Sequence, residues 1–218
     1  MECKMENSIY TSLKSRLLSS LPSRFIRNKD GLAAIEFAFI APIMLFMYFG
    51  MAEVATAISV DRKVSHSANV AGDLATQSET VSAAEMTEIM TATMLVMGIP
   101  TDKYDEVTIE IASYGRASDD SIIENGKATL KGANGINFSN FNADALDTRI
   151  LSNGSGVVVA RVNYLYEPLK LRFMPSDFNL AETFMLKPRK SNNVSIVDPL
   201  SGATEYTCNF VGNKPVCS

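Results

Sequence analysis

Few side chains in this sequence could take part in chemistry. The 218 residues include one histidine, His66, which stands between two serines. A serine and a histidine can act as nucleophile and general base, but neighbours in a helical sequence point in different directions, and no third member of such a relay is evident. A single histidine also argues against a multi-histidine metal site. We therefore expect no catalytic residue, no metal and no cofactor, and we expect His66 to face solvent.

The three cysteines divide between the two ends of the chain. Cys3 lies near the N-terminus, whereas Cys208 and Cys217 lie near the C-terminus with eight residues between them. In an exported domain, such a pair can form a disulfide that closes a small loop. In the chain-entropy model, this disulfide stabilises the folded state by about 2–3 kcal/mol. Two cysteines and a distant histidine make a poor zinc site. The sequence therefore predicts a structural disulfide between Cys208 and Cys217.

Composition excludes several classes of protein. The net charge is −4 and the isoelectric point is near 5.1, which argues against nucleic acid as the main partner. Hydrophobic residues make up 46% of the chain, so wholesale disorder is not expected. The sequence has no nucleophile elbow, HExxH, CxxC or phosphate-binding glycine loop. We therefore expect neither an enzyme nor a small-molecule substrate.

The strongest apolar run lies near the N-terminus. From Leu32 to Ala52 it contains one charged residue, Glu36. As a helix it would be about 31 Å long, which is enough to cross the core of a bilayer, and nothing downstream repeats it. Residues 1–31 carry a net charge of +3 and residues 32–218 a net charge of −7. The positive-inside rule then places the N-terminus in the cytoplasm and residues 61–218 across the membrane.

Placing a carboxylate inside a membrane helix costs free energy, so a carboxylate found there suggests a functional role. One reading is that Glu36 lies near the membrane edge and reaches the headgroups. The other rests on Gly31, which precedes the run, because Glu36 is the fifth residue after this glycine. A basic leader, a glycine and an apolar helix with glutamate at its fifth position resemble the processing site of type IV prepilins.

That resemblance implies that a membrane-embedded prepilin peptidase cuts between Gly31 and Leu32 on the cytoplasmic side. It further implies that Glu36 pairs with the N-terminal amine of a subunit in the assembling filament. Such an amine is charged at neutral pH. Because an unpaired buried charge costs several kcal/mol, pairing of the amine with the carboxylate is favourable. The sequence departs from classical pilins in having Leu32 after the glycine rather than phenylalanine. Pro42 also comes early in the span, where it should kink the helix or free a carbonyl.

A longer string of residues resembles a narrower family, the TadE/TadG family of pseudopilin-like proteins of the tight-adherence (Flp) pilus machinery. The segments Val60–Gln77 and Val157–Leu169 also resemble parts of these proteins. The resemblance implies a structural role, with other pilin-like or pilus-assembly proteins as partners. Gly50 and the alanines of the span would permit close helix packing. The N-terminal string consists of Gly31, Ala33, Ala34, Ile35, Glu36, Phe37, Ala38, Pro42, Phe49, Gly50 and Glu53.

Some family members carry a von Willebrand A-type domain with an Asp-x-Ser-x-Ser metal motif. Asp119–Ile123 is the nearest candidate, but it lacks the last serine. We therefore expect no such domain here.

Two other functions stay open. The chain could be an uncleaved, membrane-anchored periplasmic binding protein in which Glu36 is incidental. Ordinary secretion is the second, because Ala55-Thr56-Ala57 resembles a signal-peptidase site. The apolar segment is longer than the usual 7–15 residues of a signal peptide, and Glu53 stands just before the site, which argues against secretion.

Periodicity predicts the elements after the span. Apolar residues recur at helical spacing from Val54 to Ala75, and a second helix begins at a capping box of Ser82 and Glu85. The methionines of this second helix are expected in the core, and Gly98 ends it. The remaining expectations are strands over 107–111, 127–131 and 157–166, a covering loop or short helix over 170–190, loops elsewhere in 115–156, and a closing hairpin of Val194–Val197 with Thr204–Val211.

These expectations amount to an α+β protein with one N-terminal transmembrane helix, a second helix and a small antiparallel sheet. We expect a basic cytoplasmic leader over 1–31 and a transmembrane helix over 32–53. A helical stalk with the second helix over 54–98 and an α+β ectodomain with its disulfide loop over 99–218 complete the chain. The expected location is the bacterial inner membrane, with a single pass, a cytoplasmic N-terminus and a periplasmic C-terminal domain.

Overall fold

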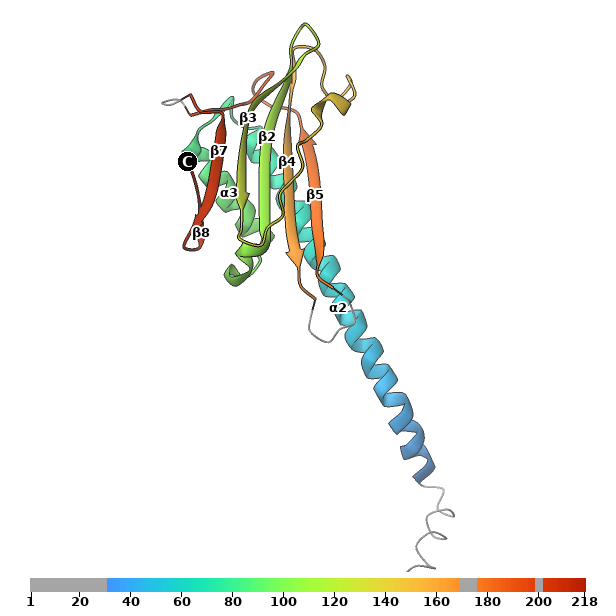
Figure 1. The fold of residues 1–218 in the computed structure, drawn as a ribbon. Helices are drawn as coiled ribbons and strands as arrows, with labels where there is room; N and C mark the ends of the chain where they lie inside the picture. The colour runs from blue at the N-terminus through green and yellow to red at the C-terminus, as the bar shows by residue number, and fades with distance from the viewer. Residues whose placement is uncertain (1–30, 169–175, 199–201) are drawn as a thin grey trace, which may run out of the picture. The chain divides into compact units, whose positions relative to one another are not determined.

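The computed structural model describes residues 31–168, 176–198 and 202–218 (Figure 1). It divides into two compact units, Met1–Ala52 and Glu53–Ser218. Helix α2 (Leu32–Ala75) supplies the helical part of the first unit and continues into the second. The fold class is α+β, as predicted from the sequence.

Helix α3 (Ala83–Met97) begins and ends as its sequence predicts. The amide of Ser82 donates to Glu85 Oε2 at 2.9 Å, and the amide of Glu85 donates back to Ser82 Oγ at 3.4 Å, which forms the capping box. Gly98 ends the helix in the left-handed region, with φ of 57°, and its amide donates to the Met94 carbonyl. A 3-10 helix, η2 (Thr101–Glu106), then leads into the sheet.

A six-stranded sheet forms the body of the second unit, in the order β5-β4-β2-β3-β7-β8 (Figure 1). Neighbouring strands are antiparallel except for β3 and β7, which are parallel, so the sheet is mixed rather than purely antiparallel. A separate parallel pair joins β1 (Thr80–Val81) to β6 (Ser195–Ile196). The strands of the main sheet are β2 (Val107–Arg116), β3 (Ile122–Lys131), β4 (Gly156–Tyr166), β5 (Phe178–Leu186), β7 (Glu205–Val211) and β8 (Lys214–Cys217).

Three expectations about the strands were wrong. β3 is a full strand of ten residues rather than a short one, because its first residues also pair with β2, beyond a bulge. Within 170–190 the described part includes strand β5, while residues 169–175 lie outside the described residues. The predicted closing hairpin does not form, because β6 pairs with β1 and β7 pairs with β3. The hairpin at this end of the chain is β7–β8.

The main core lies between one face of the sheet and the two helices. Helix α2 contributes small side chains from Ala57 to Ala75, and α3 contributes buried methionines. The apolar stripe of α2 is buried at Ala57, but its members Val54 and Ile58 are exposed, and Glu53 is buried instead. The opposite face of the sheet is covered by residues of the long β3–β4 connection, including Ala143 and Leu151.

Candidate functional site

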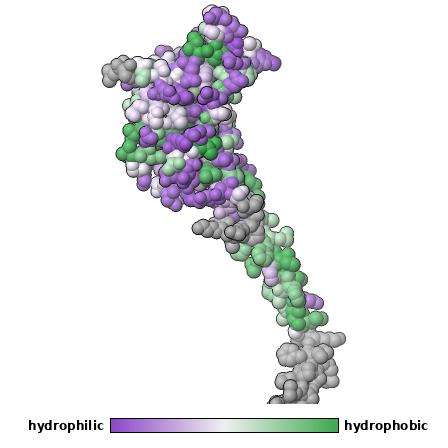
Figure 2. All heavy atoms as spheres, in the orientation of Figure 1, coloured by the Kyte–Doolittle hydropathy of each residue, from purple (hydrophilic) through white to green (hydrophobic). Residues whose placement is uncertain are grey.

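The first unit presents an apolar helix surface. Helix α2 is long and apolar enough to cross a membrane, with a mean hydropathy of 2.0 over its most apolar window of 18 residues. Figure 2 shows the hydrophobic colour along this stretch of helix. Exposed apolar surface of this extent marks a region that contacts a membrane or other proteins. Its large exposed side chains are Leu32, Ile35, Phe37, Phe39, Ile40, Ile43, Met44, Leu45, Phe46, Met47, Tyr48, Phe49 and Met51.

The predicted processing residues lie together at the start of this surface. Gly31 immediately precedes α2, and a Cβ atom built on it would meet nothing within 4 Å. Packing among the described residues therefore does not require a glycine at this position. Leu32 and Glu36 are exposed and stand four residues apart, so their side chains lie on the same side of the helix one turn apart.

The two residues expected to shape helix packing lie further along the same segment. Pro42 is inside α2, and the helix runs without interruption from Leu32 to Ala75. Because proline has no amide hydrogen, the carbonyl of Ala38 lacks its usual helical donor. Gly50 is half-buried and has no side chain among large neighbouring side chains, so another helix can approach the backbone closely there.

A second carboxylate, Glu53, begins the second unit and is buried. Its side chain is 1% exposed, and neither carboxylate oxygen has a hydrogen-bond partner within the described part of the chain. Burial raises the pKa of the Tyr166 hydroxyl, and the negative charge of Glu53 adds to that effect. Sequence reasoning placed Glu53 in the family string but gave no signal that the helix turns it inward.

The single histidine forms no catalytic arrangement with its neighbouring serines. His66 is exposed, as predicted, whereas Ser67 is buried and donates its hydroxyl to the Val64 carbonyl at 2.7 Å. Ser67 therefore points into the core while His66 points outward. Within the described ranges, no three His, Cys, Asp or Glu side chains gather as a metal ion would need.

Sequence reasoning missed a polar cluster on the sheet face opposite the helices. Arg161 of β4 donates through Nε and Nη2 to Glu110 Oε1 of β2, and both side chains are buried. Nη1 of Arg161 also donates to the Ser139 carbonyl at 2.8 Å, and its guanidinium lies 4.6 Å from the ring centroid of Phe138. These contacts attach the β3–β4 connection to the sheet, so the cluster has a structural role.

A cavity of about 280 Å³ adjoins this cluster. Tyr114 and Glu124 line it beside Glu110 and Arg161. Burial raises the pKa of Tyr114 to about 12, and the neighbouring Glu124 carboxylate contributes to the increase. Asn163, on the same sheet face, is fully buried, and its amide has no hydrogen-bond partner among the residues described.

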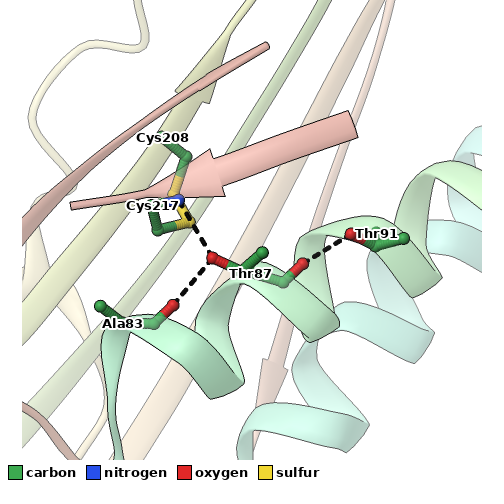
Figure 3. The surroundings of a disulfide bond; sticks show 5 residues. All are labelled: Ala83, Thr87, Thr91, Cys208 and Cys217. Carbon is green, nitrogen blue, oxygen red and sulfur yellow. Dashed lines mark hydrogen bonds between the residues drawn. A yellow bond between two sulfur atoms is a disulfide. The ribbon is translucent and has the colours of Figure 1, made fainter. Parts of the chain in front are cut away.

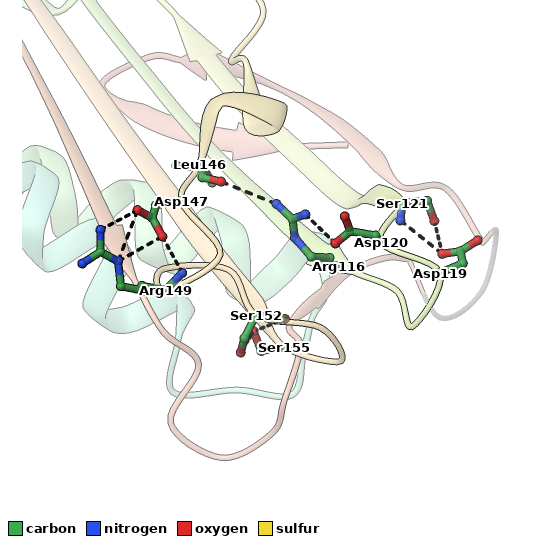
Figure 4. Close-up of polar contacts among 9 residues, drawn as sticks. All are labelled: Arg116, Asp119, Asp120, Ser121, Leu146, Asp147, Arg149, Ser152 and Ser155. Carbon is green, nitrogen blue, oxygen red and sulfur yellow. Dashed lines mark hydrogen bonds and ion pairs between the residues drawn. The ribbon is translucent and has the colours of Figure 1, made fainter.

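The acidic loop considered as a metal motif is a hydrogen-bonded turn (Figure 4). Asp119 accepts hydrogen bonds from the amide and hydroxyl of Ser121, and these bonds lower the pKa of its carboxyl group. Asp120 has a positive φ of 71° and pairs with Arg116 at 2.8 Å. Both carboxylates therefore have partners within the loop.

Cys208 and Cys217 form a disulfide across the β7–β8 hairpin, at the position predicted from the sequence (Figure 3). Both residues are buried on the side of the sheet that faces α3. The amide of Cys217 donates to Thr87 Oγ1 at 3.0 Å, and Thr87 Oγ1 donates in turn to the Ala83 carbonyl at 2.9 Å. The disulfide therefore holds the edge strand β8 where it contacts α3.

Replacing both hairpin cysteines by alanine should lower the free energy of unfolding by about 2–3 kcal/mol, since the small loop is no longer closed in the unfolded chain. Urea unfolding of the full chain under oxidising conditions, followed by circular dichroism, measures the loss. A Cys3→Ala variant should unfold like the unaltered chain, and the unaltered chain with reductant should unfold like the double variant. An unchanged midpoint in the double variant would contradict the prediction.

Comparison with known proteins gives one family match. Residues 31–73 match the family model of the TadE-like protein. No curated protein and no solved structure matches the chain. The matched segment starts at Gly31 and covers α2 up to Asp73, so it includes the apolar surface, Glu36 and the buried Glu53. The chain thus contains a TadE-like domain over residues 31–73, in agreement with the TadE/TadG-like family that its sequence resembles.

Proposed function

We propose that this protein is a pseudopilin-like component or assembly factor of a Tad/Flp-type pilus. It acts by membrane-helix packing and by protein contacts of its ectodomain, after its leader has been cleaved. The observation that supports this most directly is the exposed apolar helix surface from Leu32 to Ala52, which lies inside a TadE-like match and follows Gly31. This surface needs lipid or other helices to cover it.

The proposed mechanism begins with cleavage between Gly31 and Leu32 by a prepilin peptidase. Cleavage creates an α-amino group on Leu32, which carries a positive charge at neutral pH. The carboxylate of Glu36 lies one helical turn away along the same side of α2. In a low-dielectric environment an unpaired charge is strongly unfavourable, so Glu36 and the amine of a neighbouring subunit hold two helices together in a fixed register. No substrate is transformed in this mechanism.

The same proposal assigns the parts of the chain. Residues 1–31 are the cytoplasmic leader and residues 32–53 the transmembrane helix of a single-pass inner-membrane protein. Residues 54–98 form a helical stalk and second helix, and residues 99–218 form the periplasmic ectodomain. The charge balance supports this orientation, because the net positive charge lies before the span and the net negative charge after it.

Mass spectrometry of the N-terminal residue tests the proposal. The membrane-fraction protein would be prepared from cells with and without a prepilin peptidase. We expect a start at Leu32 only when the peptidase is present, and no such product from Gly31→Ala. Gly50→Ala makes the same substitution at a glycine inside α2 and should be processed normally.

Other N-terminal residues would contradict the proposal in different ways. A start at Met1 with and without the peptidase would contradict the processing mechanism and favour an uncleaved, membrane-anchored binding protein. A start at Ile58 would mean ordinary secretion after Ala57, and the argument about the membrane helix would fail as well. Processing of Gly31→Ala at an unchanged rate would remove the role assigned to the glycine.

A further inference from the structure

An open groove of about 370 Å³ lies beside α2 in the second unit, shortly after the apolar segment. One end is apolar, and Ile58 there is about half exposed. Arg62, Lys63 and His66 follow on the same side of α2, and all three are exposed. No acidic side chain is among the lining residues, which are Ala55, Ile58, Ser59, Arg62, Lys63 and His66 of α2 and Val96 of α3.

The order of these side chains along α2 matches the order of chemical groups in a phospholipid. Ala55 and Ile58 come first, then the hydroxyl of Ser59, then the two cations. An acyl chain can pack on the apolar end while a phosphate lies at the basic end. On the α3 side of the groove, Leu95 next to Val96 is also exposed, at 72%.

The groove lies close to the proposed transmembrane segment in the sequence. Ala55 follows the segment 32–53 by two residues, and Arg62 follows it by nine. Nine residues of helix correspond to about 14 Å, and the long side chains of Arg62 and Lys63 can extend back toward the membrane surface.

We propose that this groove binds the headgroup of an anionic phospholipid in the leaflet on the far side of the membrane. The guanidinium of Arg62 and the ammonium of Lys63 contact the phosphate, and the lipid chain lies along Ala55 and Ile58. The proposal rests on the proposed membrane anchoring. An acidic protein segment would satisfy the cations equally well, but it would not account for the apolar half of the groove.

The test uses the full chain in nanodiscs of phosphatidylcholine and phosphatidylglycerol. Native mass spectrometry counts the lipids that stay bound to the protein after it is released from the nanodisc. We expect preferential retention of phosphatidylglycerol. Each cation near a membrane surface contributes about a fivefold effect, so Arg62→Gln/Lys63→Gln should reduce the preference by about 25-fold. Lys187→Gln/Lys190→Gln removes the same charge from other exposed positions and should leave the preference intact.

Several results would overturn the proposal. An inserted chain without lipid preference would exclude the groove as a lipid site while leaving the membrane anchor in place. Equal losses in both double variants would indicate a general effect of charge. Unchanged lipid retention in Arg62→Gln/Lys63→Gln, together with lost binding of a hexaglutamate peptide, would assign the groove to an acidic protein segment. A chain that does not co-purify with the nanodiscs would overturn both this proposal and the proposed membrane anchoring.

Discussion

Replacing Glu110 by alanine is expected to lower the free energy of unfolding of the second unit by about 3–5 kcal/mol, because it leaves the guanidinium of Arg161 buried without its counter-charge. The rings of Phe138 and Phe141 lie beside the guanidinium of Arg161. Its remaining described hydrogen bond goes to the Ser139 carbonyl. The β3–β4 connection should loosen along with the pair.

Urea unfolding of the full chain in detergent, followed by circular dichroism, measures this loss. Glu88→Ala is the matched control, because Glu88 is exposed on α3 and its removal should change stability by less than about 0.5 kcal/mol. The double variant Glu110→Leu/Arg161→Met should recover much of the loss, since two apolar side chains leave no buried charge behind. A Glu110→Ala variant as stable as Glu88→Ala would show that Arg161 finds another partner.

Local signals predicted the helical elements well. The capping box at Ser82 and the left-handed Gly98 act within one or two turns of chain, so both ends of α3 follow from the sequence alone. Strand β4 was also predictable, because its run of β-branched residues leaves few alternatives. Arg161 and Asn163 are two residues apart in this strand, so they lie on one face, and the structure buries both there.

Features that depend on distant parts of the chain were not predictable in the same way. Glu110 alternates with apolar neighbours, a pattern that is typical of a strand with one solvated face, but the register of β2 and β4 places it opposite Arg161. Asn125 and Gly126 in the first half of β3 are typical of a turn, and this half is extended because it pairs with β2. β5 is likewise paired with β4 along its whole length. The direction of Glu53 depends on which side of α2 the sheet covers.

The candidate site divides in a similar way. The apolar run, Gly31 and Glu36 are close in sequence, so a single motif indicated them, and the family match covers the same residues. The groove at Arg62 and Lys63 needed the structure, because Val96 reaches it from a different helix. The family match ends at Asp73, within α2, so it gives no information about the strands of the second unit.

Gly126 occupies the most demanding backbone position of the sheet. It has a positive φ of 125° and pairs with Ser113, next to the bulge where β3 shifts its register against β2. A Cβ atom on Gly126 would lie 2.8 Å from the Cβ of Ile196 and 2.9 Å from its carbonyl carbon, and it would overlap the carbonyl oxygen. The residue therefore needs a glycine both for its conformation and for the close approach of β6.

Gly126→Ala should therefore lower the free energy of unfolding by about 3–5 kcal/mol, with contributions from backbone strain and from overpacking. Gly154→Ala separates the two causes, because Gly154 also has a positive φ, 72°, but has nothing within 4 Å of a built Cβ. That control should lose only about 1–2 kcal/mol. Both losses are measured by urea unfolding of the full chain. Equal losses would mean that β6 moves aside, and that the pairing of β6 with β1 is not rigidly coupled to the main sheet.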